Sequence, residues 1–413
     1  MNSNLSFPIP NSELPRGWRW VKLGEVCASE QNRDPKTTPD LPFRYVDISS
    51  INNNSKKIID ARTILGRDAP SRAKQIIRAN DVLVATTRPN LNAVALVPKE
   101  LSDEICSTGF CVLRPTKLIN PSFLFAFVQT QYFIDVISGQ VRGMLYPAVT
   151  DNQIRNVYLP LPPLPEQNRI ATKIQELMQE VERARNACEK QLEAAKALTA
   201  AYLREVFESE EAKRWERKRL GEVCQINPSR PKNFHRSSDS LTSFVPMAAV
   251  DEKTGTISKP EVVPYSKVAK GYTYFEENDV LFAKITPCMQ NGKHVRARSL
   301  IDGIGFGTTE FHVLRPSNEV LSEWIWYFIR QPYFLKEAAA YFTGAVGQQR
   351  VPDSFLSKYI IPLPLIEVQQ RIVYELNEKM IQVENLQSST RNQESALNAL
   401  PQAILKKAFN GGL

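Results

Sequence analysis

A proline-rich segment occurs twice in this chain and limits the folds that are open to it. The first copy is LPLPPLPEQNRI (159–170) and the second is IPLPLIEVQQRI (361–372). Three other segments return in the same order: WRWVKLGEVC (18–27) as RWERKRLGEVC (214–224), NDVLVATTRP (80–89) as NDVLFAKITP (278–287), and STGFCVLRP (107–115) as TTEFHVLRP (308–316). A repeat of about 200 residues is much longer than a solenoid repeat and predicts two similar domains.

Each repeat divides at its proline-rich segment. Before that segment stand short apolar runs typical of strands, such as DVLVAT and FCVLRP, and a helical run, PSFLFAFVQTQYFIDVI, which together predict a small α/β globule with long loops. After it, apolar or small residues recur at steps of three and four, with longer steps at the polar interruptions Gln191, Lys379, Thr390 and Gln393. They are Ile170, Ile174, Leu177, Val181, Ala184, Cys188, Ala195, Leu198 and Tyr202, and again Ile372, Leu376, Val383, Leu386, Leu397, Leu400 and Ile404. This heptad spacing predicts a long helix that begins where the prolines end.

The order of the segments also sets the direction of the two helices. If the first helix leaves the first globule and ends at the second, the second helix returns antiparallel to it. We therefore predict an α/β fold in which a long antiparallel two-helix coiled coil, about 57 Å in length, separates two similar globules related by a pseudo-two-fold axis. The expected segments are a globule at 1–160, a helix at 161–214, a globule at 215–361 and a helix at 362–413.

Composition narrows the classes of protein. The formal net charge is +8 and the pI is about 9.1, and the excess of positive charge lies in the two globules, which favours a polyanionic partner. The six cysteines form no Cys-x-x-Cys pair and there are only three histidines, so we expect buried thiols rather than a structural zinc site. No apolar run reaches the roughly 20 residues that a membrane helix needs, and we expect a cytoplasmic protein.

The repeated motifs resemble a known family. A Pro-Leu-Pro-Pro-Leu-x-Glu-Gln-x-x-Ile segment followed by a long helix, present twice with Asn-Asp-Val-Leu and Val-Leu-Arg-Pro, is similar to the DNA specificity subunit of type I restriction-modification systems. The resemblance covers essentially the whole chain. In the second copy, Glu367 and Val368 replace Pro165 and Glu166. This departure leaves the predicted fold unchanged, but the resemblance no longer implies equal contacts of the two proline-rich segments with a partner.

The resemblance implies a role without chemistry in this chain. It implies two target-recognition domains that read a bipartite, asymmetric site in double-stranded DNA, with one half-site for each globule. It also implies partners, namely two methyltransferase subunits and restriction (translocase) subunits. S-adenosylmethionine, ATP and Mg²⁺ are then expected in those partners, and no cofactor or metal in this chain. The alternatives are a stand-alone DNA-binding scaffold or repressor and, less favoured, a fragment of a single-chain restriction or methylation enzyme.

Motifs for catalysis are weak in the sequence. INPSRP (226–231) lacks the aromatic residue that stacks on a flipped base in a methyltransferase, and GIGFGTT (303–309) lacks the spacing of a nucleotide-binding loop. VDEKTG (250–255) carries Asp251, Glu252 and Lys253, the residue types of a metal-dependent nuclease, but it is more typical of a polar hairpin turn. We interpret it as a turn and expect no catalytic residue.

Candidate DNA-binding residues form three groups: a pair of loops, a pair of segments before the proline-rich copies, and one basic stretch. DNA binding needs cations for phosphates and amide or guanidinium groups for base edges. The loop TTRPNLNAV and its counterpart KITPCMQNGKHVRAR follow equivalent strands but differ in chemistry, and they supply Arg88, Asn90, Asn92, Lys284, Gln290, Asn291, Lys293 and Arg296. The segments just before the proline-rich copies supply Arg142, Tyr146, Gln348, Gln349 and Arg350. Ordinary polar loops are the alternative interpretation.

A basic stretch in the first globule forms the third group. It consists of Arg62, Arg67, Arg72, Lys74 and Arg78 and is interrupted by one acid, Asp68. Two interpretations stay open, a strip that faces phosphates or a solvated helix face. For the partner subunits, the resemblance points to exposed faces at the start of each long helix, with Glu166, Gln167, Arg169, Gln369 and Arg371 as the expected contact residues.

Overall fold

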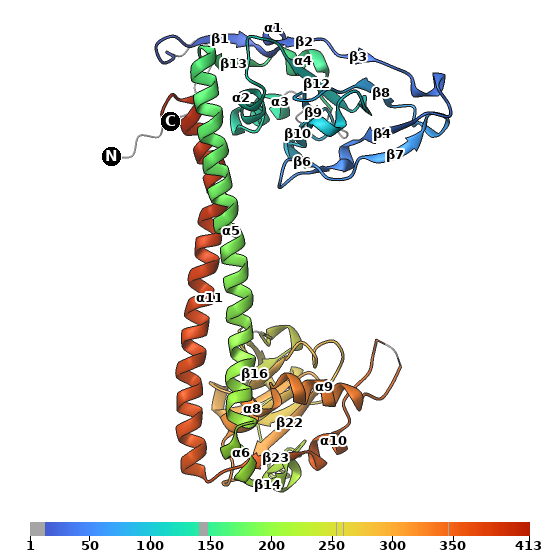
Figure 1. Cartoon of the computed structure of the whole chain (residues 1–413). Coiled ribbons are helices and arrows are strands. Elements are labelled where there is room, and N and C mark those ends of the chain that lie inside the picture. Colours follow the sequence, from blue (N-terminus) through green and yellow to red (C-terminus); the bar gives the residue numbers. More distant parts are fainter. Residues whose placement is uncertain (1–12, 140–147, 253, 259, 346) are drawn as a thin grey trace. The chain divides into compact units, whose positions relative to one another are not determined.

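The structure is a computed structural model, and it describes residues 13–139, 148–252, 254–258, 260–345 and 347–413. The chain forms two compact units. The first unit contains Met1–Glu189 and Asn392–Leu413, and the second contains Lys190–Arg391. Each unit therefore combines one globule with parts of both long helices (Figure 1).

Two sheets form most of the first globule. The four-stranded sheet has the order β10-β9-β12-β2, and the five-stranded sheet has the order β3-β8-β11-β4-β7. The strands are β2 (Cys27–Ala28), β3 (Gln31–Asn32), β4 (Pro42–Val46), β7 (Arg62–Leu65), β8 (Ala73–Ile76), β9 (Val82–Ala85), β10 (Val94–Leu96), β11 (Ile105–Ser107) and β12 (Phe110–Pro115). Pairing is antiparallel except between β11 and β4, which are parallel. The four residues of β9 are all buried, as its apolar sequence predicts.

Short elements complete the first globule. A small hairpin of β5 (Ile51–Asn52) and β6 (Lys57–Ile58) follows the 3-10 turn η2 (Ile48–Ser50), and β1 (Arg19–Lys22) pairs with β13 (Tyr158–Leu161). The short helices are α1 (Leu23–Val26), α2 (Pro121–Phe127), α3 (Gln131–Gly139) and α4 (Asp151–Arg155). Helices α2 and α3 contribute Phe123, Phe127 and Phe133 to the core, which also contains Leu405 and Phe409 from the end of the chain.

The second globule repeats this arrangement. Its sheets have the orders β15-β22-β19-β20 and β17-β16-β21-β18, and β16 and β21 are parallel, as are β4 and β11 in the first globule. The strands are β14 (Glu216–Arg219), β15 (Cys224–Ile226), β16 (Leu241–Val245), β17 (Glu261–Pro264), β18 (Thr273–Glu276), β19 (Val280–Ala283), β20 (His294–Arg296), β21 (Ile304–Gly307), β22 (Phe311–Pro316) and β23 (Ile360–Leu363). The short helices are α6 (Glu210–Arg214), α7 (Leu220–Val223), α8 (Ser322–Ile329), α9 (Pro332–Ala340) and α10 (Asp353–Lys358).

Two long helices belong to both units. Helix α5 (Leu164–Phe207) begins in the first unit, and α11 (Ile366–Phe409) begins in the second; each has 44 residues. In the first unit, Ile170 and Ile174 at the start of α5 share a core with residues at the end of α11. In the second unit, Leu203 at the end of α5 shares a core with Leu376 near the start of α11. The helices are thus antiparallel, and the predicted fold of two similar α/β globules with a long antiparallel helix pair is confirmed (Figure 1).

The predicted apolar stripe of α11 is wrong toward its C-terminal end. Leu400 is 41% exposed, whereas Leu405 is buried, so the stripe shifts position along the last turns. Thr390, which the heptad pattern left as a polar interruption, is 1% exposed, and its hydroxyl donates to the Leu386 carbonyl oxygen at 2.8 Å. A hydroxyl that bonds within its own helix is tolerated in a buried stripe, and this is why the polar residue did not mark an exposed face.

Candidate nucleic-acid interface

In the first globule, the first candidate loop contacts the described end of the second candidate segment. The β9–β10 loop (residues 86–93) lies beside the segment that precedes α4, because the Val149 backbone N–H donates to the Thr86 carbonyl oxygen at 2.8 Å. Thr87 and Ala148 also form an isolated antiparallel bridge. Arg142 and Tyr146, the two residues predicted on the segment before α4, lie outside the described residues.

The same two loops meet in the second globule. In the β19–β20 loop (residues 284–293), the Lys284 carbonyl oxygen accepts from the Val351 N–H at 2.9 Å, and the Thr286 N–H donates to the Gln349 carbonyl oxygen at 3.0 Å. Val351 and Lys284 are the counterparts of Val149 and Thr86. Equivalent backbone contacts therefore join loops whose side chains differ between the two globules.

The β9–β10 loop turns sharply and exposes two of its three predicted residues. Arg88 and Asn92 both have left-handed backbone conformations, with φ of 49° and 47°, on either side of a 3-10 turn. Arg88 and Asn90 are exposed, as a base-reading role requires. Asn92 is 6% exposed, and its Nδ2 donates to the Val128 carbonyl oxygen at 2.8 Å. The expectation that Asn92 reads a base edge conflicts with this geometry, since its amide is already bonded inside the globule.

The β19–β20 loop likewise separates exposed from internal residues. Gln290 and Asn291 are exposed at the loop's far end. Lys293 turns inward, with its Nζ 3.4 Å from the Met247 carbonyl oxygen and 3.3 Å from that of Val250. Arg296 is paired with the Glu323 carboxylate. The structure thus gives these two cations internal contacts, and the exposed amides are the better candidates for reading bases.

Three charged groups gather where the two loops of the second globule meet. Arg350 donates through Nε and Nη2 to both oxygens of Glu310, each at 2.8 Å, and these hydrogen bonds lower the pKa of the Glu310 carboxyl. Burial lowers the pKa of the nearby Lys284, and the Glu310 carboxylate opposes that shift. Gln348 is exposed and Gln349 is half-buried. Gly109 takes the place of Glu310 in the first globule, and the described residues of that globule form no such charge cluster.

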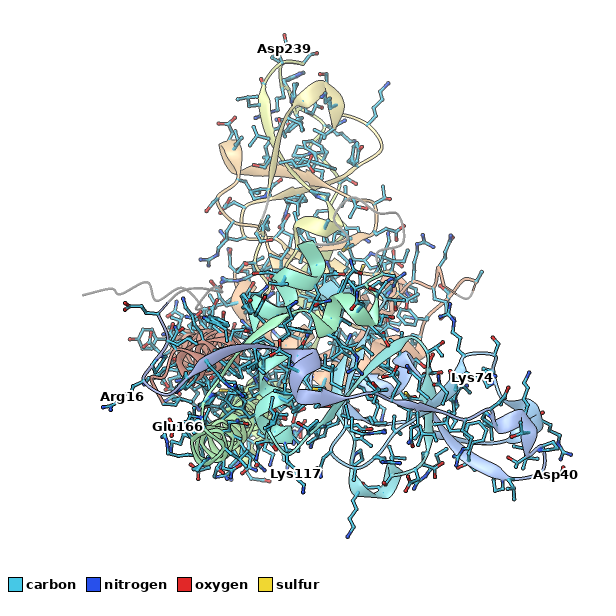
Figure 2. All side chains as sticks on the ribbon, turned by 90° about the horizontal axis from the view of Figure 1, so that it is seen from above. Arg16, Asp40, Lys74, Lys117, Glu166 and Asp239 are labelled. Carbon is cyan, nitrogen blue, oxygen red and sulfur yellow. The ribbon has the colours of Figure 1, made fainter. Side chains whose placement is uncertain are left out.

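The basic stretch of the first globule does not lie on a helix. Arg62 belongs to β7, Arg67 to a 3-10 turn and Lys74 to β8, so the alternative of a solvated helix face is wrong. Four of the five cations are paired with acids, as Arg62–Asp47 at 2.7 Å, Arg67–Asp40 at 3.0 Å, Lys74–Asp34, and Arg78–Asp103 at 3.8 Å. Lys74 and Asp40 lie at the end of the globule away from Glu166 on α5 (Figure 2). Arg72 is exposed and, within the described part of the chain, has no ion pair.

The start of α5 contains both an ion pair and a buried amide. Glu166 and Arg169 form a two-pronged ion pair at 2.7 and 2.8 Å, and Arg169 also donates to the Leu413 carbonyl oxygen at 2.5 Å. Gln167 is 1% exposed. Its Oε1 accepts from the Asn120 N–H at 2.8 Å, and its Nε2 donates to the carbonyl oxygens of Leu118 and Pro162 at 3.1 and 2.9 Å.

The first turn of α11 repeats the buried amide. Gln369 is 0% exposed, accepts from the Leu321 N–H at 2.9 Å and donates to the carbonyl oxygens of Glu319 and Pro364 at 3.0 and 2.8 Å. The expectation that Gln167 and Gln369 face a partner subunit is therefore wrong, because both side chains fasten the helix start to its own globule. Arg371 is exposed and lies 3.7 Å from Glu211.

The described residues of the segment that suggested a nuclease form a turn, as predicted, and Lys253 lies outside the described residues. Val250 and Ile257 form an antiparallel bridge, and the Asp251 carboxylate caps the turn by accepting from the Thr254 N–H at 2.9 Å. Among the described residues, no three His, Cys, Asp or Glu side chains cluster as metal ligands would. Five of the six cysteines are buried and Cys288 is half-buried. Across the same residues, no helix is long and apolar enough to cross a membrane.

Two cations beside the loops were not found from the sequence. Lys56, in the β5–β6 hairpin, and Arg330, at the end of α8, contact the β9–β10 and β19–β20 loops respectively. Neither residue lies in a loop that the sequence marks as a candidate. Only the contacts across the fold identify them.

Comparison with known proteins gives concordant results. Residues 15–193 and 212–392 both match the family described as type I restriction modification DNA specificity domain. The EcoEI specificity subunit of Escherichia coli is 36% identical over 192 residues, which cover 46% of this chain and 32% of that protein, so the match spans about a third of that relative's length. The StySPI specificity subunit of Salmonella potsdam is 20% identical over 422 residues, which cover 97% of this chain and 90% of that protein.

Two solved structures are similar to this chain over nearly its full length. The HsdS subunit from Thermoanaerobacter tengcongensis is 35% identical, with a TM-score of 0.70 over 98% of this chain and 99% of that chain. A chain from work on complex assembly and conformational transition of the type I R-M system is also 35% identical, with a TM-score of 0.80 over 97% of this chain and 100% of that chain.

Proposed function

Because this chain belongs to the type I restriction-modification DNA specificity family, we propose that it reads a bipartite DNA site in which each unit recognises one half-site. The two half-sites differ in sequence, and the target is therefore asymmetric. A protein with two identical DNA-binding halves reads a palindrome, so the difference between the two globules carries this part of the proposal.

One observation supports the proposal most strongly. The same backbone contacts join equivalent loop pairs in the two globules, but the exposed polar side chains of the β9–β10 and β19–β20 loops differ: Arg88 and Asn90 in one, Gln290 and Asn291 in the other. Arginine favours guanine edges, and asparagine or glutamine favours adenine edges. A common scaffold with different exposed chemistry is what two different half-sites require.

The proposal assigns catalysis to partner proteins. The chain would direct two methyltransferase subunits, and with them restriction (translocase) subunits, to the recognised site in the cytoplasm. S-adenosylmethionine, ATP and Mg²⁺ would bind to those partners. The half-buried Glu166 and the exposed Arg169 at the start of α5, with the exposed Arg371 at the start of α11, are charged residues available to these partners. The similarity to a chain solved in work on assembly of the type I R-M system supports this assignment.

Methylation mapping tests the proposal directly. DNA from cells that express this chain with its methyltransferase is sequenced for modified bases and compared with DNA from cells that lack only this chain. We expect a split, asymmetric motif that disappears with the chain. Methylation that persists unchanged would contradict the proposal and favour a stand-alone scaffold or repressor.

A matched pair of variants assigns the halves of the motif. Replacing Gln290 and Asn291 together by alanine is expected to relax base preference in one half of the mapped motif, and Arg88→Ala in the other. Loss of preference in the same half by both variants would contradict the assignment of one half-site to each unit.

A further inference from the structure

A small hairpin lies beside the candidate loop in each globule. In the first globule it is the β5–β6 hairpin, in which Ile51 pairs with Ile58; in the second it is the turn closed by the Val250–Ile257 bridge. Lys56 and Gly255 occupy the same position in the two hairpins, two residues before Ile58 and Ile257. Both have left-handed backbone conformations, with φ of 55° and 65°.

In the first globule, Lys56 ties this hairpin to the β9–β10 loop. Its Nζ donates to the Asn92 carbonyl oxygen at 2.6 Å and to Asn92 Oδ1 at 3.1 Å. The Asn92 amide in turn donates to the Val128 carbonyl oxygen at the end of α2. Hairpin, loop and helix are thus joined through one residue of the loop.

In the second globule, the cation comes from the opposite side. Arg330, which follows α8, places its Nη1 3.4 Å from the carbonyl oxygens of both Gly292 and His294, at the end of the β19–β20 loop. Its Nη2 lies 3.3 Å from the Glu252 carbonyl oxygen in the hairpin. Its guanidinium packs over the Trp326 ring at 4.8 Å. A Cβ atom on Gly255 would lie 2.3 Å from Arg330 Nη1, so the absence of a side chain at that hairpin position makes room for the arginine.

The two cations reach the same place in the loop. Asn92 and Gly292 each stand two residues before the first residue of the following strand, Val94 or His294, and both have positive φ, 47° and 77°. The first globule has Lys56 in the hairpin and an uncharged Gln129 after α2. The second has Gly255 in the hairpin and Arg330 after α8. A cation therefore binds the same backbone carbonyl in both globules but is supplied by different elements.

This contact has a direct consequence for the exposed tips of the loops. A left-handed conformation costs a non-glycine residue about 1–2 kcal/mol, so the loop around Arg88 and Asn92 needs outside contacts to keep one shape. A charge-assisted hydrogen bond to the carbonyl at one end of the turn supplies such a contact. Base recognition requires the exposed side chains to be held in a defined geometry.

We propose that Lys56 and Arg330 are positioning residues for base recognition: each fixes the loop of its own globule through the carbonyl of Asn92 or Gly292. Neither is assigned a contact with DNA. The inference rests on the proposed function, because it assumes that these loops read bases.

Binding measurements on single-base variants of the mapped site test the inference. The full chain, assembled with its methyltransferase, is titrated with the matched duplex, with duplexes changed at one base pair of either half-site, and with unrelated DNA. Lys56→Met keeps the length of the side chain and removes its charge. Lys57→Met, at the exposed neighbouring position of the same hairpin, is the matched control. Thermal unfolding of each variant is recorded.

We expect Lys56→Met to lower discrimination about tenfold at one half-site, the one that Arg88→Ala also relaxes, and to leave the other half-site within about twofold. Lys56→Arg, which keeps a cationic donor, is expected to retain most of the wild-type discrimination. Lys57→Met is expected to leave discrimination at both half-sites unchanged. Unchanged discrimination in Lys56→Met would overturn the inference, and so would an equal loss for all DNA, which indicates a phosphate contact or a general loss of structure.

Arg330 provides an independent arm. Arg330→Met is expected to relax the other half-site only. If wild-type protein shows no half-site discrimination at all, the proposed function fails. If wild type discriminates and both variants still do, the proposed function stands and the positioning role is wrong.

Discussion

Arg114 holds the buried carboxylate of Asp81 at 2.7 Å in the first unit, and Asp81 is only 1% exposed. Arg315 holds Asp279 in the same way at 2.8 Å in the second unit. Asp81 and Asp279 come from the repeated Asn-Asp-Val-Leu motif, and the arginines from the repeated Val-Leu-Arg-Pro motif. The two most distinctive repeats in the sequence are therefore the two halves of one buried ion pair.

Removing one partner of this ion pair is expected to destabilise the fold. Arg114→Met leaves the Asp81 carboxylate buried without its cation and should lower the free energy of unfolding of the first unit by about 3–5 kcal/mol. Urea unfolding measures it. Arg67→Met, which removes an exposed ion pair with Asp40, is the control and should change stability little. A loss no greater than in the control would contradict the role of the pair.

The buried glutamines at the helix starts give a second stability prediction. Gln167→Ala removes hydrogen bonds from one buried N–H and two carbonyl oxygens and should cost about 1–3 kcal/mol. Gln369→Ala should cost a similar amount in the second unit. Gln370→Ala, at the exposed neighbouring position, should be nearly neutral in the same urea titration. Equal effects at residues 369 and 370 would show that the buried bonds matter little.

Two exposed arginines should affect DNA binding differently. Arg88→Ala is expected to reduce discrimination at one half-site by about 1–3 kcal/mol, because guanidinium contacts to bases carry sequence information. Arg72→Ala should weaken binding to all sequences alike and reduce the salt slope by about one, as loss of a phosphate contact does. Titrations over a range of salt concentrations measure both quantities. Identical behaviour of the two variants would remove the assignment of Arg88 to base reading.

Lys56 predicts a pH dependence that is confined to one half-site. Burial lowers the pKa of the Lys56 ammonium to about 8, whereas burial lowers the pKa of Arg330 only to about 10. Raising the pH from 7 to 9 should therefore neutralise Lys56, weaken its hydrogen bonds to the uncharged Asn92 and reduce discrimination at the first unit's half-site alone. The ratio of affinities for matched and single-base-variant duplexes, measured at each pH, follows this change. The pH dependence should disappear in Lys56→Met.

The lowered pKa of Lys56 affects stability in the opposite direction: discrimination should fall as the pH rises, whereas stability should increase. An unfolded chain keeps the ordinary lysine pKa of about 10.4, so between about pH 8 and 10.4 it binds more protons at Lys56 than the folded chain does. The contribution of Lys56 to the free energy of unfolding should therefore rise with pH across that window. Comparing the pH dependence of urea unfolding for wild type and Lys56→Met isolates it. A difference that falls with pH would have the wrong sign.

Gly255 offers a steric test in the second globule. Gly255→Ala combines a positive φ of 65° with a Cβ 2.3 Å from Arg330 Nη1, and should relax discrimination at the second unit's half-site and destabilise that unit by about 1–3 kcal/mol. Gly271→Ala is a matched control, since its φ is 79° but nothing lies within 4 Å of the added Cβ. The loss of stability and discrimination in Gly255→Ala beyond that in Gly271→Ala measures the steric clash with Arg330. Equal losses in the two variants would mean that the hairpin moves to relieve the clash.

The sequence predicts the scaffold of this protein better than its surfaces. The repeats fall on buried contacts, such as Asp81–Arg114 and Gln167 with the Leu118 carbonyl, so their recurrence reports a fold used twice. The candidate loops were found because they differ between the repeats while the strands before them do not. Gln167 was assigned to a partner contact because the sequence does not distinguish a glutamine that is buried at a helix start from one that is exposed there. Lys56 was missed because its partner, Asn92, is 36 residues away, and its functional counterpart stands on another element.

The different placement of Lys56 and Arg330 restricts which segments of the two globules are interchangeable. A recombination event that joins the hairpin of the first globule to the loop and helix of the second would bring two cations to one carbonyl and place a side chain where Gly255 leaves room. The reciprocal product would have glycine in the hairpin and Gln129 after the helix, and so no cation at all. Crossovers that preserve a working loop must therefore keep hairpin, loop and helix together. The smallest unit that can be inherited intact is larger than the loop that differs between the two globules.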